Sequence, residues 1–145
     1  MSNITDVEIK KLEQTANEIR KSVIESLVEA GSGHTAGSLG LADIFTYLYF
    51  HGMKHDAKNP KWPERDMFVL SNGHVCPGLY ATMAHAGYFP VVELMTLRKL
   101  GSRLQGHPHR EALPGIETSS GPLGSGISQA IGMALAIRLD SGKSA

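Results

Sequence analysis

The chain has 145 residues, of which 41% are hydrophobic and 19% are charged, a composition typical of a soluble globular domain and not of a disordered segment. Its 14 basic and 14 acidic residues cancel, which argues against a nucleic acid or an anionic membrane surface as partner. Cys76 is the single cysteine, so no intramolecular disulfide forms, and no apolar run approaches the ~20 residues that span a bilayer. Because the N-terminus is also polar and lacks an apolar signal core, we expect a cytoplasmic protein.

The first predicted element is a helix over residues 6–30. Apolar side chains recur every three or four positions along it, which is the spacing of one buried helix face. Thr5 followed by Glu8 has the pattern of a capping box, and Gly31 favours a helix end. After a short glycine-containing break, a second helix is expected over 38–50, where leucine and aromatic side chains predict burial.

One short stretch predicts a strand. Residues 67–70 (MFVL) are apolar and have turn-forming residues on both sides, as is typical of a buried parallel strand. Further helices are expected over 77–87 and over 90–100, the second of which opens at a proline.

The C-terminal part is predicted to be a long loop followed by a last helix. Residues 101–123 show little periodicity, and loops of this length in compact domains usually have a function. The last helix is expected from 124 or 126 to 139. These segments favour an α/β protein that is mostly helical in this chain, with at least one buried parallel strand. Since a lone strand forms no sheet, its neighbours are hidden in the sequence, belong to a partner chain, or lie beyond the end.

Residues 119–126 (SSGPLGSG) precede the last helix and allow two interpretations. Gly121, Gly124 and Gly126 can adopt positive φ and carry no Cβ that would block a ligand. The helix behind them offers free N–H groups and the positive end of its dipole, which favours an anion or cofactor site. A turn that allows close packing explains the same composition, and the segment matches neither a Walker loop nor a GxGxxG motif.

Three of the seven histidines directly follow a glycine: His34, His74 and His107. Such histidines can converge on one cleft, where they donate hydrogen bonds or move protons near neutral pH. The alternative is that each is an ordinary solvated loop residue. Three others are expected in structural or exposed positions: His51, His55 and His85.

Metal and thiol chemistry are disfavoured by the pattern. The histidine spacings are weak zinc signals, and Cys76 has neither a partner cysteine nor a base beside it in sequence. We therefore predict no metal site within the chain and a buried, structural Cys76. Asp43, Glu93 and Arg98 fall on predicted helices and are assigned to packing edges or solvent faces.

Three motifs together resemble transketolase. They occur in the same order and at similar intervals, and the resemblance extends from about residue 12 to residue 140. They are SGHTAGSLGLADI (32–44), DMFVLSNGH (66–74) and LRKLGSRLQGHPHREALPGIETSSGPLGSGISQAIGMALA (97–136). The segments GSRLQGHPHR and LPGIE are most similar to the split form of the enzyme, in which the N-terminal thiamine-diphosphate-binding half is a separate subunit. A related thiamine diphosphate enzyme, deoxyxylulose-phosphate synthase, is the alternative within the superfamily.

The resemblance implies a role for each matching residue. His34 and His107 would line the substrate cleft and act in catalysis, and Thr35 stands where the family commonly has proline. Four residues would contact thiamine diphosphate: His74, Gly121, Pro122 and Leu123. The implied reaction is transfer of a two-carbon ketol unit between sugar phosphates, in which the cofactor supplies the electron sink and imidazoles donate and recover protons.

The resemblance also shows what is missing. The family's GDG…N motif, whose Asp and Asn bind the magnesium that carries the diphosphate, has no counterpart here. We therefore expect residues 1–145 to be the N-terminal portion of a thiamine-diphosphate-binding domain, truncated before that motif. A C-terminal transketolase subunit and a homodimer mate are the expected partners, with little activity from the chain alone. A non-catalytic remnant or binding module is the alternative from a different class.

Overall fold

The computed structural model describes residues 4–141 and begins with a long helix, α1 (Asp6–Ala30). Its start is the predicted capping box: Thr5 Oγ1 accepts from the Glu8 N–H at 3.3 Å, and the Glu8 carboxylate accepts from the Thr5 N–H at 2.8 Å. Gly31 ends it in the left-handed conformation at φ 62°. The predicted helix is confirmed. Its buried face consists of Ala16, Ile19, Ser22, Val23, Ser26 and Leu27.

The helix expected over 38–50 is formed as three consecutive pieces. They are α2 (Thr35–Gly40), α3 (Ala42–Tyr47) and the π-helical turn η1 (Leu48–Gly52). The chain bends at Leu41, whose φ and ψ of −93° and −2° depart from helical values. The glycine that ends α2 weakens the helix at this point.

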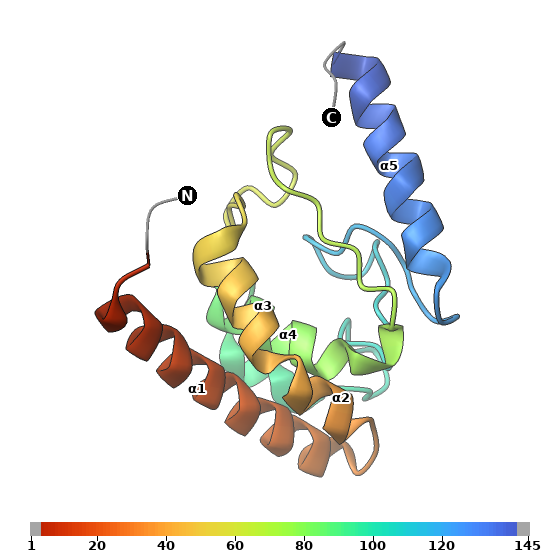
Figure 1. The fold of residues 1–145 in the computed structure, drawn as a ribbon. Coiled ribbons are helices and arrows are strands. Elements are labelled where there is room, and N and C mark those ends of the chain that lie inside the picture. The colour runs from red at the N-terminus through yellow and green to blue at the C-terminus, as the bar shows by residue number, and fades with distance from the viewer. Residues whose placement is uncertain (1–3, 142–145) are drawn as a thin grey trace.

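Helix α4 (Cys76–His85) is the centre of the fold, and α1, α2 and α3 all pack around it (Figure 1). Its first nine residues are all buried, as expected for a helix that is apolar on every side. The short 3-10 turn η2 (Gly73–Val75) leads into it. The helix predicted over 90–100 is instead a 3-10 helix, η3 (Val91–Thr96), with Pro90 as its N-cap.

The strand predicted at 67–70 is not formed. None of the described residues 4–141 belongs to a β-strand, and residues 67–70 have irregular backbone with only Leu70 buried. A strand satisfies its backbone groups by pairing with a neighbour, and the described chain offers none. The described part of the fold is therefore helical, and the α/β expectation is corrected on this point.

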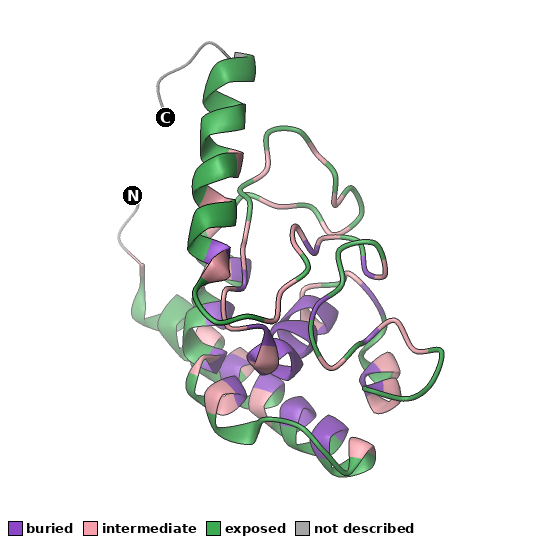
Figure 2. Ribbon diagram, turned by 90° about the vertical axis from the view of Figure 1, so that its right-hand side faces the viewer, coloured by how far each residue is buried: buried purple, intermediate pink, exposed green. Residues whose placement is uncertain are grey.

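The long loop and the last helix are both present. Residues 101–123 contain no regular element, yet Leu104, Leu113 and Ile116 from this loop are buried in the core. The last helix, α5 (Ser125–Ser141), stands apart from the other helices (Figure 1), and most of its residues are exposed (Figure 2). Among residues 4–141, no helix combines the length and apolarity needed to cross a membrane.

Candidate functional site

Two of the three predicted site histidines contact each other. His34 is the exposed residue before α2, and His74 is a partly buried residue of η2. Their ring centroids lie 5.0 Å apart at an interplanar angle of 65°. Ser38 Oγ donates to the His34 carbonyl at 2.8 Å and lies 3.5 Å from the Val75 carbonyl, which ties the two segments together. Segments far apart in sequence thus bring two imidazoles to one place.

The third histidine, His107, is held at the same end of α4 through its neighbours. Cys76 Sγ lies 3.2 Å from the Gly106 carbonyl, and the Tyr80 hydroxyl donates to the Gln105 carbonyl at 3.0 Å. Burial raises the pKa of the Cys76 thiol to about 12, so the thiol stays protonated and acts as a donor. Cys76 is fully buried, as predicted. His107 itself is exposed, and the structure shows no direct contact between it and the other two histidines.

The turn that carries His74 packs directly on the glycine-rich loop. A Cβ on Gly73 would lie 2.8–2.9 Å from atoms of Ser120, and a Cβ on Gly126 would lie 2.6 Å from Ser71 Cα. Real Cβ atoms do not approach that closely, so both positions require glycine. At Gly126 the close-packing interpretation of this segment is therefore the right one.

The middle of the same loop is different. A Cβ on Gly121 or on Gly124 would meet no atom within 4 Å, and Gly124 has φ 84°. Pro122 and Leu123 are exposed, and Leu123 keeps 73% of its surface. This part of the loop therefore borders open space beside His74, and that space suits a ligand that makes backbone and apolar contacts.

Two buried hydroxyls in this loop are without hydrogen-bond partners within the described residues, those of Thr118 and Ser120. A buried hydroxyl without a partner costs free energy, so such groups usually meet a polar atom that the chain itself does not provide. The Ser120 N–H donates to the Pro108 carbonyl at 3.2 Å, which places the orphaned hydroxyl between the His74 and His107 segments.

Arg98 is a residue that sequence reasoning missed. Periodicity assigns it to an exposed helix face, but η3 ends before it and Arg98 lies in a turn with φ 61°. Its guanidinium lies beside Gly33 and Gly106, the residues that precede His34 and His107. No local signal in the sequence indicates this position, because it depends on how the turn closes on the loop.

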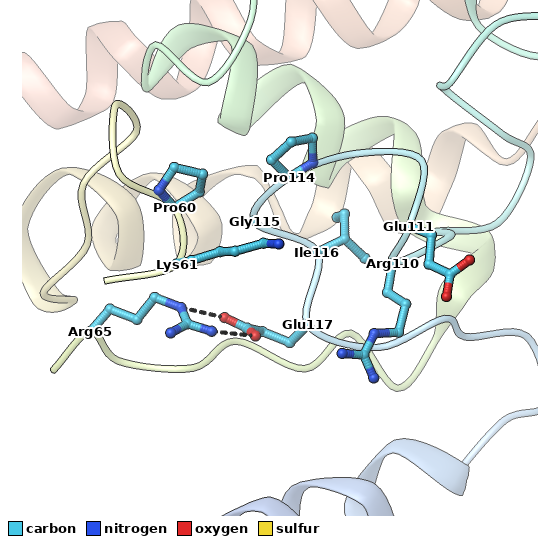
Figure 3. A pocket seen from close by; sticks show the side chains of 9 residues that line it. All are labelled: Pro60, Lys61, Arg65, Arg110, Glu111, Pro114, Gly115, Ile116 and Glu117. Atoms are coloured by element: carbon cyan, nitrogen blue, oxygen red, sulfur yellow. Dashed lines mark hydrogen bonds and ion pairs between the residues drawn. The ribbon is translucent and has the colours of Figure 1, made fainter. Parts of the chain in front are cut away.

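A cavity of about 620 Å³ lies elsewhere in the fold, and none of the three site histidines lines it (Figure 3). Arg65 and Glu117 face each other there and form a two-point ion pair, with N–O distances of 2.8 and 2.7 Å. The remaining lining residues are Pro60, Lys61, Arg110, Glu111, Pro114, Gly115 and Ile116. The pair joins the long loop to the irregular segment between η1 and η2, so we assign this region a structural role.

No group of three or more His, Cys, Asp or Glu side chains suited to a metal ion occurs within residues 4–141. The glycine-rich loop leaves open space at Gly121 and Gly124, and the described residues offer no ligand cluster for a cation there. The prediction that magnesium ligands lie outside this chain is compatible with this arrangement and stays a prediction.

The chain matches the family described as "Transketolase, thiamine diphosphate binding domain" over residues 11–144. It is therefore a part of a thiamine diphosphate binding domain. It belongs to the transketolase family, as the three sequence motifs predicted.

Several relatives show how this chain compares with other members. It is 46% identical over 129 residues to the 6-deoxy-6-sulfo-D-fructose transketolase subunit SqwG of Clostridium sp. (strain MSTE9), covering 89% of this chain and 47% of that subunit. It is 44% identical over 134 residues to chloroplastic transketolase of Spinacia oleracea, covering 91% of this chain and 18% of that protein. Transketolase from Leishmania mexicana superimposes with a TM-score of 0.83 at 40% identity, over 86% of this chain and 19% of that one. The chain thus spans less than half the length of each.

Proposed function

We propose that residues 1–145 form the N-terminal portion of the thiamine-diphosphate-binding half of a transketolase. The family match, which extends over residues 11–144, is the observation that carries this proposal. The similarity to SqwG favours the split organisation, in which this half is a subunit of its own. The activity is transfer of a two-carbon ketol unit between sugar phosphates, and the composition with one buried cysteine supports a cytoplasmic location.

The site residues divide into two groups by their positions. His34 and His107 are exposed and carry the substrate side of the site, where an imidazole can donate a proton to a developing alkoxide and recover it. The cofactor side consists of four residues around the open part of the loop: His74, Gly121, Pro122 and Leu123. Thiamine diphosphate, when bound, supplies the electron sink for this chemistry.

The rest of the site comes from other polypeptide. The described residues contain no metal-ligand cluster, and α5 exposes apolar side chains along its length. We propose that the remainder of the thiamine-diphosphate-binding half covers α5 and provides the magnesium ligands. A C-terminal transketolase subunit and a homodimer mate complete the assembly. The isolated chain then has little or no transketolase activity.

Reconstitution tests the proposal directly. The chain is fused at Ala145 to the part of SqwG that follows the aligned region, and co-expressed with the C-terminal subunit of the same Clostridium transketolase. We expect ketol transfer from the assembled enzyme and none from the chain alone. His34→Ala and His107→Ala should lower kcat by about 100-fold or more, as loss of a general acid–base does. A folded but inactive assembly, or full activity of both variants, would contradict the proposal.

Cofactor binding gives a second, independent measurement. Titration of the isolated chain with thiamine diphosphate and Mg²⁺ in a calorimeter should show no tight, Mg²⁺-dependent binding. In the assembled enzyme, His74→Ala should weaken cofactor binding, whereas the buried structural change Cys76→Ala should leave it in place. Tight Mg²⁺-dependent binding by the isolated chain would contradict the statement that the metal ligands lie elsewhere.

A further inference from the structure

The cavity of about 620 Å³ lies between two segments that are distant in the sequence (Figure 3). One wall comes from the irregular segment between η1 and η2, and the other comes from residues 110–117 of the long loop. Its volume is that of a site for a small molecule. The Arg65–Glu117 pair holds the two walls together, and this structural role leaves the space beside the pair unexplained.

The loop wall of the cavity is fixed by its own hydrogen bonds. The Arg110 N–H donates to Ser119 Oγ at 3.1 Å, and the Ser120 N–H donates to the Pro108 carbonyl at 3.2 Å. These bonds close the stretch into a compact loop of the Ω type, a class that frequently has a function. Two of its apolar side chains are buried in the core, Leu113 and Ile116. The cavity is therefore formed before any ligand binds.

The charges that line the cavity do not cancel one another. Arg65 donates through Nε and Nη2 to the two carboxylate oxygens of Glu117, at 2.8 and 2.7 Å. Its Nη1 donates to the Trp62 carbonyl at 2.9 Å, so each nitrogen of this guanidinium has a partner. The Glu117 charge is thus neutralised by Arg65 alone and offers little attraction to the other cations of the lining.

Lys61 and Arg110 are the other two cations, and they come from opposite walls. Both residues are exposed, and within residues 4–141 neither side chain forms a hydrogen bond or an ion pair. Figure 3 shows the Lys61 side chain extending toward the loop, whereas the carboxylate of Glu111 is turned away from Lys61. Two positive groups therefore border one preformed space without an anion between them.

We propose that this cavity binds a small organic dicarboxylate. One carboxylate accepts from the Arg110 guanidinium, whose planar fork matches two oxygens, and the other pairs with the Lys61 ammonium. The carbon chain of the ligand lies against the apolar part of the lining, which consists of Pro60, Pro114 and Ile116. Because the two cations stand on separate walls, they favour a ligand with two separate anionic groups over one compact anion.

Binding to the full chain can be measured by saturation-transfer NMR, with malonate, succinate, glutarate and adipate as the probes. We expect at least one of these dicarboxylates to bind with a Kd of about 1 mM or lower, and more weakly as salt is added. Butyrate, which has a single carboxylate, and inorganic phosphate, a single compact anion, should bind at least about 10-fold more weakly. No binding by any of the four dicarboxylates would overturn the proposal.

Substitutions in the lining locate the site. Lys61→Gln and Arg110→Gln should each weaken dicarboxylate binding about 10-fold, the effect of losing one charge-assisted hydrogen bond. Because both side chains are exposed, the midpoint of urea unfolding should stay unchanged. Glu111→Gln removes a repelling charge from the lining and should strengthen binding. Lys58→Gln is the matched control, since Lys58 is exposed on the same segment but does not line the cavity.

Equal Kd values for the wild type and both lining-cation variants would overturn the proposal. So would an equal loss with Lys58→Gln, because that outcome indicates attraction by overall charge alone. Amide hydrogen exchange gives a structural readout: the bound dicarboxylate should slow exchange at residues 110–117, and unchanged exchange there would contradict binding at this cavity. An acidic peptide that binds more tightly than every dicarboxylate would overturn the small-molecule assignment in favour of a protein-docking surface.

Discussion

Helices α4 and α5 are both apolar on all sides, yet the chain surrounds only one of them. The first nine residues of α4 are buried among α1, α2, α3 and η3. On α5, large apolar side chains remain open to solvent, and Figure 2 shows most of this helix as exposed. They are Ile127, Ile131, Leu135, Ile137 and Leu139, which keep between 47% and 82% of their surfaces. A helix that is apolar all round belongs in a core, so α5 has the sequence of a core helix without its surroundings.

This difference between α4 and α5 explains why packing holds only part of the candidate site in place. The segments that hold His34, His74 and His107 all adjoin the buried α4, so their positions are fixed by packing. The glycine-rich loop is packed at both of its ends, Ser120 against Gly73 and Gly126 against Ser71, before the chain continues into the uncovered α5. The two ends of the loop therefore serve close packing, and its middle, at Gly121 and Gly124, borders open space.

The largest expected effect is on self-association of the chain, when the apolar surface of α5 is removed. Ile127, Ile131 and Leu135 recur every fourth residue and share one face of the helix. Because exposed apolar patches drive association, the wild-type chain should self-associate in sedimentation velocity. A triple change of these residues to Gln should give mostly monomer. The control Val7→Gln with Val28→Gln, at exposed positions on α1, should still associate. A monomeric wild-type chain would contradict the expectation that the apolar face of α5 drives association.

Matched truncations in the two helices should differ strongly in the free energy of unfolding. Leu79→Ala in α4, where the side chain is 2% exposed, should cost about 2–5 kcal/mol because it leaves a cavity. Leu135→Ala in α5, where the side chain is 54% exposed, should change it by less than about 0.5 kcal/mol. Urea unfolding measures both, under conditions that keep the chain monomeric. Similar costs would mean that α5 is packed in solution.

Elements with local signals could be predicted from sequence. Helix α1 is specified by Thr5, Glu8 and Gly31, which all act within one turn of its ends, and its boundaries are confirmed. The long loop 101–123, predicted from its glycines, its prolines and its lack of periodicity, is likewise confirmed by the structure. The glycine-flanked motifs suggested that His34, His74 and His107 can converge on one cleft. His34 and His74 contact each other, His107 makes no direct contact with them, and the chemical roles of all three stay predictions.

Features that depend on distant contacts could not be predicted. The apolar run at 67–70 has a strand's composition, but a strand needs a neighbour to pair with, and residues 4–141 supply none. The requirement for glycine at Gly73 comes from Ser120, a residue far along the chain. Helical periodicity wrongly placed Arg98 on a helix, because its turn depends on the bond from its N–H to the Leu104 carbonyl; its exposure agrees with the prediction.

The ion pair that anchors the long loop should be the next largest contributor. Arg65 and Glu117 are 14% and 12% exposed and form two short bonds. Glu117→Gln leaves Arg65 largely buried without its counter-charge, so unfolding free energy should fall by about 3 kcal/mol. The comparison is Glu29→Gln at the exposed Lys99 pair, which should cost less than about 1 kcal/mol. Equal losses would show that the loop is not anchored in this way.

The two helix starts should also differ, by a smaller amount. Thr5→Ala removes the N-cap of α1 and should cost about 1 kcal/mol. Ser125→Ala at the start of α5 removes only an exposed bond, donated to the Pro122 carbonyl at 2.9 Å, and should cost less than about 0.5 kcal/mol. Thermal unfolding followed by circular dichroism compares them. A larger loss for Ser125→Ala would indicate that α5 contributes more to stability than its exposure suggests.

The smallest expected effect is a pH dependence of the free energy of unfolding, which arises from His85 at the contact between α1 and α4. Burial lowers the pKa of His85 from its usual 6.5, with Glu18 acting in the opposite direction, and His85 Nε2 lies 3.0 Å from Ser22 Oγ. Because the unfolded chain binds this proton more readily, stability is fully present above pH 6.5 and falls as pH drops from 6.5 towards the lower folded pKa. His85→Gln should remove this part of the pH dependence of urea unfolding, whereas His51→Gln, at an exposed position, should keep it. Because Ser22 of α1 and His85 of α4 meet here, amide protection factors should fall first in these two helices as the pH is lowered, and a uniform fall that includes α5 would contradict the assignment.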